Sequence, residues 1–192
     1  MGRWPVRAVV VLATCGAVAA CGGKPVRLAR FSDSQTGVSF SYPAAWRVQY
    51  ADSGLSLEES IVVTLSTFHL QSPCRRLSAS SGECGVALMA KHLPPGGVFV
   101  VWTDGGPVQG PNYPEGMPGA STTVGGRPAK LSTKRSQGGC DLPEASQTIT
   151  AYVTGPVTMT ACGRDGKNFK AEVVALLKSV EFTTPRPTRL GA

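Results

Sequence analysis

Short segments in which apolar and polar side chains alternate follow one another along most of this 192-residue chain, separated by glycine and proline. In residues 37–42 the side chains of Val38, Phe40 and Tyr42 are spaced to share one side of a strand. Pro43 then ends the segment, because proline has no N–H to donate to a sheet ladder. This pattern predicts sheet structure with one apolar face.

The same patterning predicts most of the remaining strands. The run Val98–Trp102 is apolar throughout, which is typical of a central strand. Residues 86–92 are predicted to be a short helix that stops at Pro94. Residues 104–121 are predicted to be a long loop, either an ordinary connection or a partner surface around Tyr113 and Met117. Further strands are expected at residues 26–31, 46–48, 61–68, 122–132, 147–154 and 157–162, with Ile61, Val63, Leu65 and Phe68 turned inward and turns at Gly125-Gly126 and Gly155-Pro156.

A helix is predicted near the C-terminal end of the chain. Its apolar residues recur at helical spacing and are expected to pack on the sheet. Asn168 is the predicted N-cap. Residues 181–182 are expected to add a short strand. The apolar residues of this helix are Phe169, Val173, Leu176, Leu177 and Val180.

The N-terminal residues have the layout of an export signal. Arg3 and Arg7 precede an uncharged apolar run over residues 8–20, which is shorter than the roughly 20 residues a spanning helix needs. Residues 18–21, Val-Ala-Ala-Cys, resemble the lipobox of bacterial lipoproteins, in which Cys21 is lipidated and the chain is cut before it. Cys15 follows a threonine and fits the lipobox less well.

These observations predict a lipoprotein at the extracytoplasmic face of the cell membrane. Cys21 would carry a lipid anchor with fatty acids such as palmitate, and two lipid chains hold a protein stably. The alternatives are an ordinary secreted protein cut near Ala20 and an uncleaved anchor. The predicted organisation is a signal peptide (1–20), a tether (21–29), one domain (30–183) and a tail (184–192).

Four cysteines follow Cys21, and an even number in an exported chain predicts disulfide bonds. Three pairings are open, of which Cys74–Cys84 and Cys140–Cys162 are favoured. Each would stabilise the fold by roughly 2–4 kcal/mol. The spacing does not fit a zinc site, because there is no Cys-x-x-Cys, and the same absence argues against a redox role.

The formal net charge is +7, and the basic residues are scattered. Nucleic acid is therefore not expected as a partner. The charge is better suited to a solvated surface, or to general attraction toward an anionic lipid surface or envelope polymer. The partners predicted are the membrane, through Cys21, and an envelope protein or polymer.

Two stretches resemble PsbP-like domains. Residues 37–48, Gly-Val-Ser-Phe-Ser-Tyr-Pro-Ala-Ala-Trp-Arg-Val, resemble the opening motif of that family, although Val38 replaces its aromatic residue. Residues 171–182 resemble the closing helix. The resemblance implies an α+β fold, an antiparallel sheet sandwiched by helices, and a binding or assembly module without catalytic residues. Tyr42 and Trp46 of the motif are expected to be structural.

No catalytic, metal or cofactor motif is found. His69 and His92 are the two histidines, and there is no Gly-x-Ser-x-Gly elbow. The carboxylate groupings, Glu58-Glu59 and Asp141 with Glu144, form no calcium loop. We therefore expect a non-enzymatic binding or assembly module without a cofactor. The alternatives are a secreted hydrolase of envelope material, with a histidine beside a serine and a carboxylate, and a carrier with a dry cavity for an apolar ligand.

Overall fold

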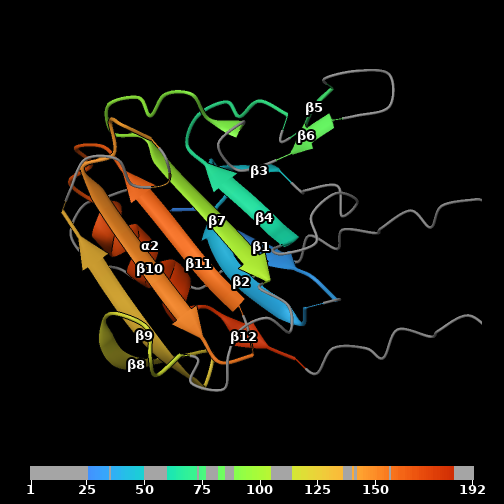
Figure 1. Cartoon of the computed structure of the whole chain (residues 1–192), viewed down its shortest axis with the longest axis vertical. Coiled ribbons are helices and arrows are strands. Elements are labelled where there is room, and N and C mark those ends of the chain that lie inside the picture. The colour runs from blue at the N-terminus through green and yellow to red at the C-terminus, as the bar shows by residue number, and fades with distance from the viewer. Residues whose placement is uncertain are drawn as a thin grey trace, which may run out of the picture.

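The structure is a computed structural model. It describes residues 26–34, 36–49, 60–72, 74–76, 82–84, 89–104, 114–135, 140, 142–155 and 157–183. Within these ranges the chain forms a seven-stranded sheet, a three-stranded sheet and a separate two-stranded hairpin. Figure 1 shows the seven-stranded sheet in front, with α2 and the smaller sheet behind it.

All strand pairs of the seven-stranded sheet are antiparallel. The order across the sheet is β3-β4-β7-β11-β10-β9-β8. The strands are β3 (Arg47–Gln49), β4 (Ser60–Ser66), β7 (Val98–Asp104), β8 (Ala120–Val124), β9 (Arg127–Lys134), β10 (Gln147–Val153) and β11 (Val157–Gly163).

The layer behind this sheet is part sheet and part helix. Strands β1 (Leu28–Ser32), β2 (Val38–Pro43) and β12 (Glu181–Phe182) form the smaller sheet, with β2 in the middle. Helix α2 (Phe169–Lys178) lies beside them. The Ser179 hydroxyl joins the two parts, because it accepts the backbone N–H of Ser41 at 2.9 Å and donates to Leu176 O at 2.7 Å.

The main core lies between the two layers. Phe40 of β2 stacks on Trp102 of β7, with ring centroids 5.2 Å apart. Val63 and Leu65 of β4 are fully buried beside them. The helix contributes its predicted apolar residues, Phe169, Val173, Leu176, Leu177 and the following Val180.

A second apolar cluster covers the opposite face of the seven-stranded sheet. Phe99 and Val101 point into it, whereas Val98, Val100 and Trp102 point into the main core. Successive side chains of β7 therefore enter the two clusters in turn, and both faces of the strand are buried. This explains why its apolar run is uninterrupted. The cover is formed by Leu70, Met89, Ala90, Leu93, Leu142 and Ala145.

The expected fold class, an α+β sheet sandwiched by helices, is wrong. The fold is mostly β, with antiparallel sheets of three and seven strands, and α2 is the ten-residue α-helix of the described residues. Helix α2 shares the back layer with a sheet, and the described part of the front cover comes mostly from segments without regular secondary structure. Of the helix expected at 86–92, residues 86–88 lie outside the described residues. Met89 is helical but residues 90–92 are not, so the expected C-terminal end of this helix is wrong.

Two further expectations need correction. Ile61 packs in the second cluster instead of beside Val63, because the β4–β7 register shifts between them. Asn168 does occupy the N-cap position, but its side chain makes no capping hydrogen bond. The hairpin of β5 (Cys74–Arg76) and β6 (Gly82–Cys84) was not predicted, since that stretch is polar and rich in turn residues.

The other predicted strands are confirmed, including the hairpin of β8 and β9 around Gly125 and Gly126. Both glycines have positive φ, 57° and 78°, which suits the tight turn of a two-residue hairpin. A Cβ on Gly125 would lie 2.6 Å from the Phe182 ring, whereas a Cβ on Gly126 would meet nothing within 4 Å. The guanidinium carbon of Arg127 lies 4.0 Å from the same ring centroid. The turn thus packs closely on β12.

We expect Gly125→Ala to lower the free energy of unfolding more than Gly126→Ala does. Both substitutions impose backbone strain of about 1–3 kcal/mol. Only the first also displaces the Phe182 ring. Chemical denaturation of both variants measures the difference, and equal losses would show that the Phe182 contact contributes nothing.

Candidate functional site

The residues predicted to anchor the chain lie outside the described residues. This applies to the signal peptide (1–20), to Cys21 and to the tail (184–192). Among the described residues, no helix combines the length and the apolar character needed to cross a membrane. The anchor therefore remains a prediction.

The cysteines fall in two places. Cys140 and Cys162 form a disulfide, with Cα atoms 6.2 Å apart. It ties the segment at 140–145 to β11 beneath the second cluster. Cys74 and Cys84 stand directly opposite each other in the β5–β6 ladder. Opposed residues of antiparallel strands lie about 4.5–5.5 Å apart, within the range of a disulfide. The Cys74–Cys84 bond itself stays a prediction.

The loop expected at 104–121 is partly replaced by strands. Strand β7 continues to Asp104 and β8 begins at Ala120. Tyr113 lies outside the described residues, and the described part, 114–119, is a turn in which Met117 N–H donates to Pro114 O at 2.9 Å. Met117 is only partly exposed.

His92 lies beside a carboxylate. Its Nδ1 is 2.9 Å from Glu144 Oε1, and its side chain is 83% exposed. The hydrogen bond from His92 lowers the pKa of Glu144, and the backbone N–H of Glu144 adds to the effect. Asp141 and the Glu58-Glu59 pair lie outside the described residues.

His69 lines a pocket at the edge of the seven-stranded sheet. After β4, the Ser66 hydroxyl donates to Phe68 O at 2.5 Å and the Thr67 hydroxyl accepts Val98 N–H at 3.0 Å. These bonds turn the chain back alongside β3. Leu70 is buried in the second cluster, so His69 on the preceding position is left at the surface.

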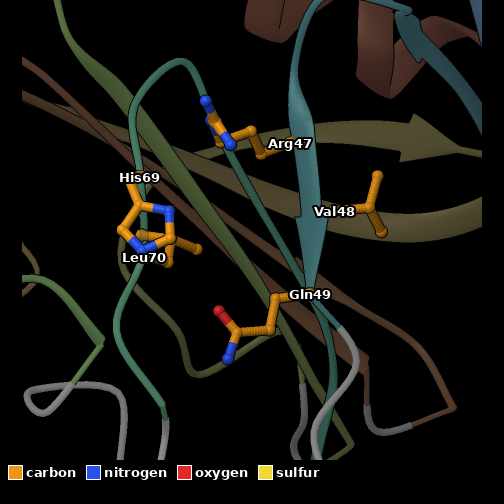
Figure 2. A pocket seen from close by; sticks show the side chains of 5 residues that line it. All are labelled: Arg47, Val48, Gln49, His69 and Leu70. Atoms are coloured by element: carbon orange, nitrogen blue, oxygen red, sulfur yellow. The ribbon is translucent and has the colours of Figure 1, made fainter.

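Strand β3 supplies the opposite wall. Its alternation points Val48 toward the main core and leaves Arg47 and Gln49 on the other side. Figure 2 shows Arg47 and Gln49 extending toward the segment that carries His69 and Leu70, and Val48 extending away. The Gln49 amide nitrogen donates to Gln71 O at 3.1 Å, which fixes that wall to the neighbouring segment.

The resulting pocket, called here the Arg47–His69 pocket, has a volume of about 340 Å³ and is lined by Arg47, Val48, Gln49, His69 and Leu70. Its lining includes a guanidinium, an imidazole and an amide. Among the described residues neither the Arg47 guanidinium nor the His69 ring has a hydrogen-bonding or ion-pairing partner. The lining residues that the structure describes include no carboxylate and no hydroxyl.

This arrangement suits the binding of an anion. A guanidinium presents five N–H donors in a fork that matches carboxylate and phosphate oxygens. Sequence reasoning considered His69 only as a catalytic residue and did not single out Arg47 or Gln49. The signal available was the alternation around Val48, which places both polar side chains on one side of an edge strand.

The described residues show no group of three or more His, Cys, Asp or Glu side chains placed to hold a metal ion. The two histidines have different surroundings, since His69 belongs to the pocket and His92 pairs with Glu144. Comparison with protein-family models finds no match, and comparison with characterised proteins and with solved structures finds none either.

We expect His92→Ala to raise the pKa of Glu144 toward the ordinary value for glutamate, because the hydrogen bond from His92 is the main cause of its lowering. In the native chain this carboxylate favours folding at neutral pH, and its contribution is lost as the pH falls through the lowered pKa. NMR titration of the Glu144 carboxyl measures the change. An unchanged titration in His92→Ala would contradict the assigned cause.

Proposed function

We propose that this protein is a lipid-anchored, non-enzymatic binding module of the cell envelope, and that the Arg47–His69 pocket takes a small anionic group such as a carboxylate or a phosphate. The observation that carries the ligand class is the pairing of Arg47 and His69 in one pocket whose described lining residues include no carboxylate. The lipobox at residues 18–21 supports the anchor.

The pocket offers an anion several hydrogen bonds at little cost in rearrangement. Arg47 projects from a strand that is paired with β4, and His69 is held between the turn at Ser66 and the buried Leu70. Charge-assisted hydrogen bonds to a guanidinium are roughly twice as strong as neutral ones. Because Arg47 is exposed, the pocket can exchange its ligand with solvent.

Binding is favoured over hydrolysis by the surroundings of the two histidines. A Ser/His/acid mechanism requires a nucleophile and an orienting carboxylate within hydrogen-bond reach of one imidazole. The described lining around His69 offers neither, and the Glu144 partner of His92 contacts a histidine that is largely in solvent.

The anchor predicts that a fatty-acid probe fed to cells labels the native chain and the Cys15→Ala variant but leaves Cys21→Ala unlabelled. Only Cys21 follows the lipobox residues, and Cys15 serves as the matched control within the same apolar segment. Labelling is read from the purified protein on a gel. Equal labelling of native and Cys21→Ala chains would exclude lipidation at this residue.

The pocket predicts that Arg47→Gln weakens the binding of inorganic phosphate at least about tenfold, since a charge-assisted hydrogen bond contributes about 1.5–3 kcal/mol. Binding is followed by the NMR shift of the His69 ring during a phosphate titration. Lys134→Gln is the control, because it removes the same charge from an exposed position at the end of β9. If both variants weaken phosphate binding equally, the effect is one of net charge and the pocket is not the site.

A further inference from the structure

An apolar groove lies where the two parts of the back layer meet. It has a volume of about 370 Å³ and opens on the outer side of β1, β2 and α2. Val26, Leu28 and Pro43 line it from the smaller sheet, whereas Ala171 and Ala175 line it from the helix. The groove is a surface feature beside the main core, which lies on the inner side of the same elements.

The groove also contains the large apolar side chains that the described residues leave in water. Val26 is 68% exposed and Leu28 is 60% exposed. Such contiguous apolar surface marks sites where a protein meets another apolar phase, because leaving it in water is unfavourable.

The charges around the groove are mainly basic. Ala171 and Lys178 are both exposed, and their spacing of seven residues places them on one side of the helix. Lys167 is exposed in the turn that precedes α2. Arg30 on the outer face of β1 is paired with Glu181. Glu172 lines the groove, and burial raises its pKa. Covering the groove, and so removing water from around Glu172, would therefore favour the neutral form of its carboxyl further.

The length of chain before the groove fits a nearby membrane. Four residues lie between Cys21 and Val26, so the five Cα–Cα steps that join them span at most about 18 Å when fully extended. A lipid on Cys21 would hold the groove close to the bilayer surface. Lysines attract anionic headgroups only within about one Debye length, about 10 Å in 0.1 M salt.

From these observations we propose that the groove and the outward side of α2 form a membrane-docking surface for anionic phospholipids, with Val26 and Leu28 inserted among the lipids and Lys167 and Lys178 over the headgroups. This inference rests on the proposed lipid anchor. It goes beyond the anchor, because it specifies which face of the domain meets the bilayer.

The test uses the full lipidated chain, purified from a bacterium that processes its signal and reconstituted into vesicles of phosphatidylcholine with phosphatidylglycerol. An indole introduced by Leu28→Trp is expected to shift its emission to the blue and to be quenched by brominated acyl chains. Thr123→Trp, at an exposed position of the far edge strand β8, is expected to do neither. The native tryptophans of the domain, Trp46 and Trp102, are buried and supply a constant background.

The charge contribution is tested in the Leu28→Trp background. Lys167→Glu with Lys178→Glu is expected to lower the quenching at least twofold while flotation with the vesicles is unchanged. Lys134→Glu, on the seven-stranded sheet, is the matched control and should have no effect. Vesicles of phosphatidylcholine alone should give weaker quenching of the Leu28→Trp indole.

The outcomes separate docking from anchoring. A chain that carries fatty acid and floats with vesicles, yet leaves the Leu28→Trp indole in water, overturns docking alone. A chain without fatty acid overturns the anchor and docking together. A blue shift of the Leu28→Trp indole that appears without vesicles when the protein concentration is raised assigns the groove to a second copy of the chain. Quenching by a brominated fatty acid without vesicles assigns it to a free apolar ligand, and both results contradict membrane docking.

Discussion

The burial of β7 on both faces is the constraint on which the rest of the fold depends. Every side chain from Val98 to Trp102 needs an apolar neighbour, so both faces of the seven-stranded sheet must be covered. On one face the stack of Phe40 on Trp102 holds the smaller sheet in place. On the other face Phe99 packs in one cluster with Met89 and Leu142, which come from two separate segments. Because the two covers differ in kind, the molecule has two unlike sides.

The surface features arise where this covering ends. The three-residue strand β3 is the edge of the seven-stranded sheet, and short edge strands limit pairing with other chains. Its outer polar side chains, Arg47 and Gln49, are therefore free to form a pocket with the segment after β4. The groove forms at the seam between the smaller sheet and α2, because a helix and a twisted sheet do not interlock completely along their common border. Both features thus follow from the edges of layers and not from their centres.

Most strands could be predicted because alternation, proline and glycine act locally. The helix was also predictable, since Phe169, Val173 and Leu176 share one face whatever they pack against. Fold class could not be predicted in the same way. The front cover contains Leu93 and Leu142 in segments without periodicity, so their burial depends on the disulfide and on contacts distant in sequence. The pocket was missed because its two nitrogen-bearing side chains, Arg47 and His69, come from separate segments that only strand pairing brings together.

The two surface features are linked through one short turn. Pro43 lines the groove and Arg47 lines the pocket, and between them Trp46 is buried in the main core. Trp46 N–H donates to Pro43 O at 2.9 Å, and Ala44 N–H donates to Arg27 O at 2.8 Å, which fixes the turn against the start of β1. A rigid connection of this kind sets the direction of the pocket once the groove meets a surface. Docking through α2 and β1 would therefore orient the pocket as well as hold the domain at the membrane.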